Sequence, residues 1–290
     1  MSNLRCVWPL AAKLGEGPAW SVPEAALWFV DIKSRKIHRF DPSTGEKRSW
    51  DAPDQVTFVL PRTDGAHIVG LPGKLARFDS VTGNFETLRT LEPSYPRNRT
   101  NDACIDAAGQ LWFGTMDDGC TEAHGALYSW NGAGAPVLHD DGYVISNGPA
   151  FSPDGRTLYH TDTVRRTIYR FDVAPDGSVS GKRNFVEIED GAGAPDGSVV
   201  DAEGCVWVAL YGGWGVRRYS PRGELLQTVT FPCANVTKMA FGGPDLKTAF
   251  ATTAAQELTA GELAKQPLAG GLFAFDVDVP GIAQRAMTSA

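Results

Sequence analysis

Short apolar runs of about five residues, separated by clusters of Gly, Asp, Asn and Pro, follow one another along the whole chain. The first clear one is LWFVDI at 27–32, and a second run, KIHRFD at 36–41, follows it closely and leads into the turn PSTG at 42–45. Runs of this length, bounded by turn-forming residues, are typical of β-strands joined in hairpins. No stretch has a convincing helical period. The pattern therefore predicts an all-β protein.

The strand pairs repeat at a nearly constant interval. A strand that ends in an aromatic residue and an acid recurs at 75–79 and 167–172, and more loosely at 215–220. Aligning the strand that precedes each of these gives spacings of about 41, 43, 47, 48 and 43 residues between Trp28, Val69, Trp112, Tyr159, Trp207 and Phe250. A period of this size is typical of four-stranded propeller blades. Six such units fill the chain.

The two ends of the chain are expected to complete the ring. The last strand candidate, at 271–277, lacks a complete unit of its own and can pair with the region around 6–8. Such closure leaves only short, protected sheet edges. We therefore expect residues 1–290 to form one domain, a six-bladed β-propeller of four-stranded antiparallel blades. The alternatives, a β-sandwich pair or an open meander, do not explain the regular period.

Composition and charge exclude several classes of partner. The net charge of −7 and the pI near 5.3 argue against nucleic acid or an anionic membrane as the main partner. The five cysteines have no paired spacing, so we expect them to be small buried residues in a reducing compartment. The N-terminal segment breaks its apolar character too early for a secretory leader. We expect a cytoplasmic protein, and a monomer is favoured although nothing in the sequence decides the oligomeric state.

The repeat also aligns one polar position in every unit. Counting back 11 or 12 residues from each aligned position reaches Glu16, Thr57, Asn101, Asn147, Asp196 and Lys238. The innermost strand of a propeller blade begins near the central axis, so residues at this offset converge on one place. Each polar residue taken alone can be read as capping a turn, since Asn and Asp beside Gly or Pro often do so. The shared offset favours a polar ligand site instead.

Three of these residues suit a metal ion. Glu16, Asn147 and Asp196 offer oxygen ligands without sulfur or imidazole, which fits a hard or borderline divalent cation such as Ca²⁺, Mg²⁺ or Mn²⁺. Three protein ligands leave positions for water and substrate, as in catalytic metal sites. Arg99 and Asn101 can donate hydrogen bonds to ligand oxygens, although Arg99 can also be a surface residue.

Other catalytic patterns are missing. The chain has no Gly-x-Ser-x-Gly elbow and no phosphate loop ending in Gly-Lys-Ser/Thr. Its five histidines have no two-ligand spacing, and isolated histidines of this kind are usually structural. Whether Lys238 balances the charge of the acids, and whether Asp102 orients Arg99 or caps a turn, stays open at this point.

Several segments, taken in order, resemble the successive motifs of the SMP-30/gluconolactonase/luciferin-regenerating-enzyme family, which includes animal regucalcins and bacterial sugar lactonases. These segments are LGEGP at 14–18, RTND at 99–102, LWFGTM at 111–116, SNGP at 146–149, PDG at 195–197 with DAEG at 201–204, FGGP at 241–244 and PLAGG at 267–271. The resemblance covers nearly the whole chain. Segments at 31–33, 51–58 and 235–238 are most similar to bacterial pentonolactonases.

The resemblance implies a function and assigns residues to it. It implies one divalent metal ion (Ca, Zn, Mn, Mg or Fe) held by Glu16, Asn147 and Asp196, with substrate contacts from Arg99 and Asn101. The implied activity is hydrolysis of a small-molecule sugar lactone, such as a glucono-, xylono- or arabinonolactone, to the aldonic acid. Asp196 is then also the expected catalytic base.

One segment departs from the family pattern. The segment 117–125 is shorter than the lid of animal members, and Glu122 is the candidate for its acidic substrate contact. The alternative functions are a divalent-metal-binding propeller without catalysis and a hydrolase of another ester.

Overall fold

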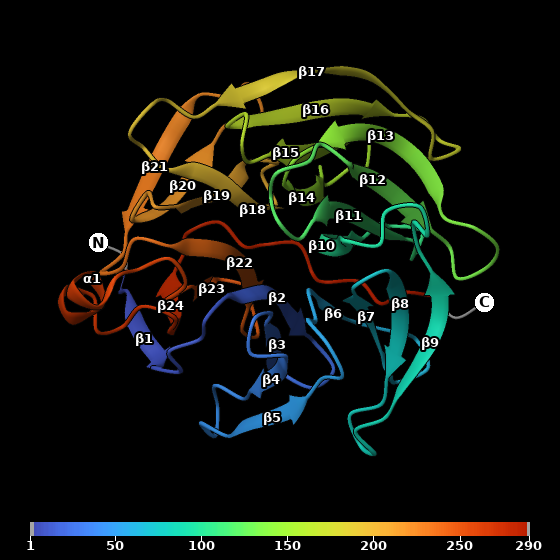
Figure 1. Cartoon of the computed structure of the whole chain (residues 1–290). Helices are drawn as coiled ribbons and strands as arrows, with labels where there is room; N and C mark the ends of the chain where they lie inside the picture. The colour runs from blue at the N-terminus through green and yellow to red at the C-terminus, as the bar shows by residue number, and fades with distance from the viewer. Residues whose placement is uncertain (1–2, 289–290) are drawn as a thin grey trace.

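A computed structural model describes residues 3–288 of the chain. Within this range, the strands form six four-stranded antiparallel sheets. Figure 1 shows these sheets arranged as blades around a central axis. The predicted six-bladed β-propeller is confirmed.

Each blade contains four strands, which follow one another from the central axis to the outer edge. The innermost strands are β2 (Gly15–Ser21), β6 (Val59–Pro61), β10 (Asn98–Ile105), β14 (Ser146–Phe151), β18 (Ala194–Val200) and β22 (Val236–Gly242). The second strands are β3 (Ala26–Asp31), β7 (His67–Leu71), β11 (Leu111–Asp117), β15 (Thr157–Asp162), β19 (Val206–Tyr211) and β23 (Thr248–Thr253). The third strands are β4 (Lys36–Phe40), β8 (Lys74–Phe78), β12 (Gly125–Trp130), β16 (Thr167–Val173), β20 (Gly215–Tyr219) and β24 (Leu272–Asp276). The outermost strands are β5 (Lys47–Asp51), β9 (Phe85–Thr90), β13 (Val137–Tyr143), β17 (Val179–Glu187), β21 (Leu225–Thr230) and β1 (Arg5–Trp8).

The sixth blade joins the two ends of the chain. The N-terminal strand β1 pairs antiparallel with β24, with Arg5 opposite Ala274 and Cys6 opposite Phe273. The expected closure by terminal strands is therefore confirmed. Because the first strand and the last strand of the chain belong to one sheet, opening the ring requires breaking the hydrogen bonds between β1 and β24.

The apolar core is divided among the junctions between neighbouring blades. The aligned positions of the repeat lie in the second strand of each blade, where their side chains are buried. Trp112, for example, is 1% exposed and packs with Leu158 and Phe171 of the next blade. A large aromatic side chain fills the wedge between two twisted sheets, and this explains why the repeat keeps an aromatic residue at most of these positions.

The turn before the second strand holds its tryptophan in place. The carboxylate of Asp201 accepts the backbone N–H groups of Glu203 and Cys205, both at 3.0 Å, and the indole N–H of Trp207 at 2.9 Å. Asp106 accepts the indole N–H of Trp112 at the same six-residue offset, at 2.8 Å. The recurring acid thus fixes the turn and the buried indole together.

A short helix appears where the sequence pattern suggested none. In the described part of the chain, α1 (Ala260–Lys265) is the one α-helix, and none of its residues is buried. Its N-terminus is set by a capping box, in which the Thr259 hydroxyl accepts from the Glu262 N–H and the Glu262 carboxylate accepts from the Thr259 N–H. A helix of six residues without a buried face has no apolar period to detect. Across residues 3–288, no helix has the length and apolar character needed to cross a membrane.

Candidate active site at the propeller axis

The innermost strands are bulged where the candidate site residues stand. The pairing with the second strand shifts register between residues 16 and 19, 100 and 103, 147 and 150, and 195 and 198. A bulge turns a side chain away from the direction that the regular pleat would give it. Gly148 allows the bulge beside Asn147, because its φ of 46° is strained for a residue with a side chain.

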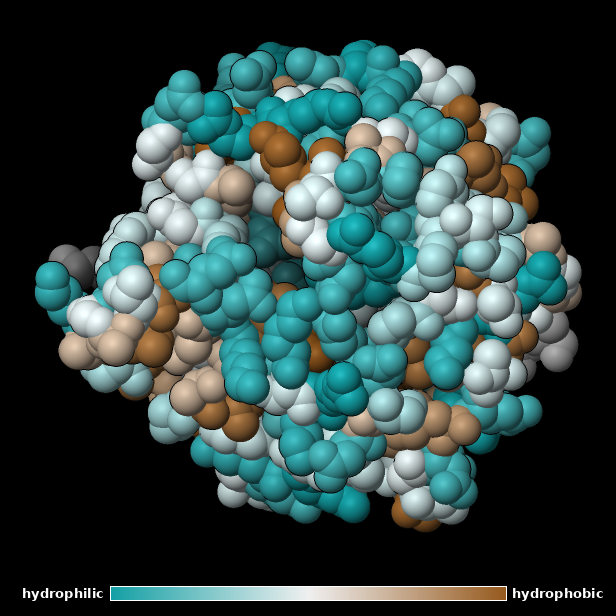
Figure 2. All heavy atoms as spheres, viewed as in Figure 1, coloured by the Kyte–Doolittle hydropathy of each residue, from teal (hydrophilic) through white to brown (hydrophobic). Residues whose placement is uncertain are grey.

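Five of the predicted residues line one cavity of about 180 Å³, called the site cavity below. These are Glu16, Arg99, Asn101, Asn147 and Asp196, and all five are buried. They come from four of the innermost strands, and all but Arg99 lie at the offset shared by the repeats. Figure 2 shows a hollow near the centre of the ring, surrounded mainly by hydrophilic residues.

Burial and neighbouring negative charge oppose the ionisation of both carboxylates of the cavity. Burial, and then the charge of Asp102, raises the pKa of Glu16 to about 8. Burial, and then the charge of Glu16, raises the pKa of Asp196 well above its usual range. The free-energy cost of ionising two buried acids in one cavity is high unless a cation lies between them.

The amide of Asn147 is oriented by its neighbours. Its nitrogen donates to the Thr163 hydroxyl at 2.9 Å, and that hydroxyl donates to the Pro195 carbonyl at 2.8 Å. The Asn147 oxygen accepts from the Asn101 amide at 2.8 Å. With its nitrogen committed to Thr163, Asn147 presents an oxygen as its available ligand atom.

The donor set fits a divalent cation. Within residues 3–288, no group donates a hydrogen bond to the Asp196 carboxylate, and Glu16 accepts only the N–H of Gly17, at 2.8 Å. Two carboxylates and an amide oxygen match the preference of hard cations, and a double positive charge would offset the repulsion between the acids. No three His, Cys, Asp or Glu side chains of the described residues gather as a metal-binding group, because the third oxygen here comes from an amide.

A buried ion pair lies beneath these residues. Lys238 donates to the Asp102 carboxylate and, at 3.3 Å, to the Ala103 carbonyl. Asp102 also accepts the N–H of Gly148 at 2.9 Å, next to Asn147. A side chain at Gly197 would place its Cβ 2.5 Å from Lys238 Cγ, so only glycine fits beside the lysine stem. Lys238 is therefore buried near the acids and is not a surface residue, and Asp102 bonds to Lys238 and to backbone N–H groups, while no bond to Arg99 is found among the described residues.

Thr57, the remaining aligned position, is buried outside the site cavity. Its hydroxyl shares a 2.7 Å hydrogen bond with that of Thr100. Thr57 therefore links two neighbouring blades and does not contribute to the site cavity.

Arg99 is held from both sides. Its guanidinium donates to the Asn101 side-chain oxygen at 2.6 Å and to the Asp118 carboxylate at 2.8 Å. Asp118 also accepts from Lys33 at 2.9 Å and from Gln55 at 3.0 Å. Burial would raise the pKa of Asp118, but the bonds from Gln55, Lys33 and Arg99 outweigh it and lower that pKa to about 2. The ionised carboxylate therefore fixes the Arg99 side chain at the edge of the cavity.

The segment 117–125 places its residues differently from the expectation. Glu122 is exposed, and the cavity wall does not include it; its backbone N–H donates to Asp117 at 3.4 Å. Cys120 lines the cavity and is exposed, and Cys6 and Cys104 are half-buried, so the expectation that the cysteines are buried holds only for Cys205 and Cys233. Cys120 is exposed because it lies in a loop outside the strands, at a positive φ of 55°. Tyr211 and Glu257 complete the rim and share a 3.1 Å hydrogen bond that no repeat pattern indicates.

Curated relatives match nearly the whole chain. The chain is 34% identical over 283 residues to 6-deoxy-6-sulfogluconolactonase of Pseudomonas putida, covering 97% of each protein. It is also 34% identical over 281 residues to Pentonolactonase XacC of Haloferax volcanii, and 33% identical over 291 residues to human regucalcin, covering 93% and 97% of each chain.

Solved structures and a family model agree with these relatives. Regucalcin from Agrobacterium tumefaciens, described as a calcium-binding protein, superimposes with a TM-score of 0.94 at 28% identity, covering 99% of this chain and 97% of that one. Residues 14–255 match the model of the SMP-30/Gluconolactonase/LRE-like region. The chain therefore belongs to the SMP-30/gluconolactonase/LRE-like family.

Proposed function

We propose that this protein hydrolyses a sugar lactone to the aldonic acid, and that it depends on one divalent cation held by Glu16, Asn147 and Asp196. Relatives named as lactonases support the reaction class. When bound, the cation would polarise the lactone carbonyl and stabilise the negative charge that develops on its oxygen during attack by water.

The observation that carries the proposal is the joint position of two kinds of group. Two carboxylates and an amide oxygen that suit a cation line the same small cavity as Arg99 and Asn101, which suit the hydroxyl groups of a sugar. A site that only stored a cation would have no use for a guanidinium fixed at its edge.

Each residue in and beneath the site cavity has its own proposed role in the reaction. Asp196 accepts no hydrogen bond from the described residues, so its carboxylate is available to take the proton of the attacking water. Arg99 orients the ring hydroxyls of the lactone, because one terminal nitrogen of its guanidinium donates to no described residue. Asn101 offers its side-chain oxygen to the same hydroxyls, since its amide nitrogen already donates to the Ser146 carbonyl and to Asn147. Asp102 and Lys238 hold the base of the site but do not contact its opening.

The substrate is proposed to be an aldonolactone. Relatives named for a pentonolactone and for a sulfonated gluconolactone share about one third of this sequence. A panel of glucono-, xylono- and arabinonolactone therefore covers lactones of both six-carbon and five-carbon sugars.

A pH-indicator assay on this panel tests the proposal. Acid release above spontaneous ring opening is expected from the metal-loaded protein, and a chelator should abolish it. The matched control is Asn131→Ala, an asparagine in an exposed turn, which should leave turnover unchanged, whereas Asn147→Ala should remove it. Hydrolysis that persists in the chelated protein, or in a folded Asn147→Ala variant, contradicts the proposal.

A second candidate is a cation-binding protein without catalysis. The solved relative described as calcium-binding favours it. Cation binding without acid release from any lactone of the panel would support this candidate instead.

A further inference from the structure

A second cavity lies at the opposite ends of the innermost strands. Its volume is about 150 Å³, and the wall includes residues that follow the site residues along the same strands, such as Ala103 and Ser198. The stem of Lys238 lines this lower cavity, while its ammonium group bonds to Asp102. The buried ion pair thus separates the lower cavity from the site cavity.

The C-terminal segment 278–288, called the strap below, crosses the lower cavity. Backbone hydrogen bonds tie its start to blade five, where the Ala202 N–H donates to the Pro280 carbonyl at 2.9 Å. They tie its end to blade three, where the Thr288 N–H donates to the Gly109 carbonyl at 3.0 Å. Anchored on both sides of the axis, the strap brings Arg285 to the lower cavity.

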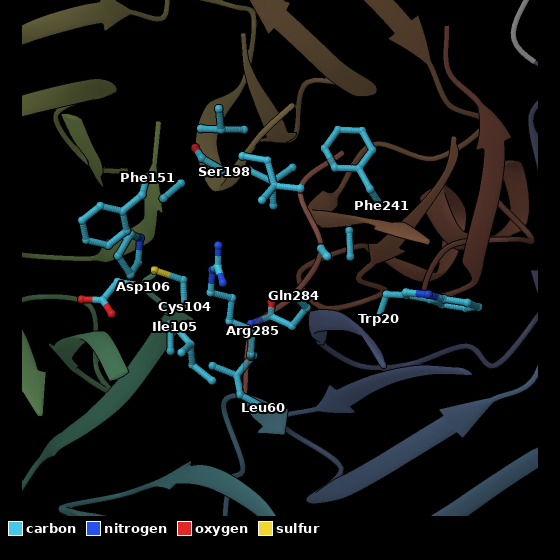
Figure 3. A pocket seen from close by; sticks show the side chains of 18 of the residues that line it. Trp20, Leu60, Cys104, Ile105, Asp106, Phe151, Ser198, Phe241, Gln284 and Arg285 are labelled. Carbon is cyan, nitrogen blue, oxygen red and sulfur yellow. The ribbon is translucent and has the colours of Figure 1, made fainter. Parts of the chain in front are cut away.

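Arg285 is an exposed residue of the strap, and its positive charge has no ion-pair partner in the described part of the chain. Figure 3 shows its side chain rising into the cavity with the guanidinium nitrogens directed inward. No carboxylate of residues 3–288 forms an ion pair with it. Asp106 lines the same cavity, but its oxygens accept from the Trp112 indole at 2.8 Å and from the Gln110 N–H at 3.0 Å. A guanidinium without a partner is a natural site for a carboxylate.

The rest of the wall is mainly apolar. Trp20, Phe58, Leu60, Phe151 and Phe241 surround the space, and Figure 3 shows Phe151, Phe241 and Trp20 on different sides of it. An apolar cavity of about 150 Å³ can hold a benzene-sized molecule. Two residues of the strap that line this cavity, Ile282 and Arg285, are exposed.

We propose that the lower cavity binds a small organic carboxylate with an apolar body, its carboxylate on Arg285 and its body among the aromatic side chains. This site is separate from the lactone site and does not depend on the proposed hydrolysis. A polyhydroxylated acid, such as the proposed product, fits the aromatic wall less well because its hydroxyl groups would lose their hydrogen bonds to water.

Benzoate is the probe that tests this proposal. Binding is measured by calorimetry and ligand-observed NMR on the full chain, with a chelator present so that benzoate cannot coordinate a metal ion. Saturable binding is expected, and Arg285→Gln should weaken it roughly tenfold, since a hydrogen bond to a charged group is lost at an exposed residue where solvent weakens the interaction. Benzamide, which has the same shape without the charge, should not compete.

Two control variants distinguish the cavities. Arg222→Gln removes an exposed arginine elsewhere and should leave benzoate binding unchanged. Arg99→Gln alters the site cavity and should also leave it unchanged. The proposal is overturned if benzoate does not bind the wild type, if a folded Arg285→Gln variant binds it equally well, if Arg99→Gln abolishes binding, or if gluconate binds more tightly than benzoate.

Discussion

The contact between Asp118 and Arg99 makes a specific prediction about substrate binding. Replacing Asp118 by Ala removes the carboxylate that accepts from Arg99 at 2.8 Å. Arg99 keeps its 2.6 Å hydrogen bond to Asn101, so its side chain stays in the cavity. It loses the hydrogen bond that holds the guanidinium on the side of Asp118. The substitution therefore perturbs the orientation of the Arg99 guanidinium and leaves this hydrogen-bond donor in the cavity.

The expected loss in kcat/KM depends on how far the Asp118 carboxylate is exposed to solvent. Hydrogen bonds to charged groups contribute about 1.5–3 kcal/mol. The Asp118 side chain is 36% exposed, so solvent weakens its interaction and the lower end applies. A loss of about 1.5 kcal/mol corresponds to a decrease of roughly tenfold in kcat/KM. Since Arg99 is proposed to bind ring hydroxyls before and during the reaction, the decrease should appear mainly as a higher KM.

Initial rates on the best lactone of the panel provide the test. Asp118→Asn keeps an acceptor in the same place and should recover most of the loss. Asp51→Ala, which removes the partner of Lys36 at an 86% exposed position, is the control and should change nothing. An unchanged kcat/KM in a folded Asp118→Ala variant would refute the positioning role, as would a loss confined to kcat.

Three further predictions concern stability and the loop at 117–125. Asp201→Ala should lower the free energy of unfolding in urea by about 3–5 kcal/mol, because the Trp207 indole and two backbone N–H groups lose their acceptor and Arg218 keeps only Glu203 as a partner. Asp176→Ala, in an exposed turn, should cost about 1 kcal/mol or less, and equal losses would contradict the argument. Burial lowers the pKa of His67 from 6.5 to about 4, so below pH 6.5 the unfolded chain binds a proton that the folded chain does not, and stability falls with acid. His67→Phe should therefore recover roughly 2 kcal/mol of the stability lost between pH 6.5 and about pH 5, and an unchanged pH slope would disprove this account. Glu122→Gln should change KM by less than about threefold because Glu122 is exposed outside the cavity; a much larger increase would place Glu122 at the substrate.

The repeat made most of the fold predictable. Each blade must bury a large side chain against the next, so the aligned positions from Trp28 to Phe250 carry the period directly in the sequence. The pairing of β1 with β24 was predictable because the last unit lacked one strand. The helix α1 was not, since its six residues are held by a local cap at Thr259 and have no buried face.

The site was predictable only where it follows the repeat. Glu16, Asn101, Asn147 and Asp196 share one offset, and the strands bring equal offsets to the same cavity. The contacts of Asp118 with Lys33 and of Asp102 with Lys238 join residues 85 and 136 positions apart. Nothing in the local pattern of either partner indicates the other, because these pairs depend on how different blades and loops meet.

The central claim is that one cation, held by Glu16, Asn147 and Asp196, is required for lactone hydrolysis. The most direct measurement adds a divalent metal stepwise to the metal-free protein while lactone hydrolysis is followed. Activity should rise from none to a plateau at one metal ion per chain, and folded Asp196→Ala protein should stay inactive at every metal concentration. Full activity in the metal-free protein, or turnover near the wild-type rate in Asp196→Ala, would contradict the claim.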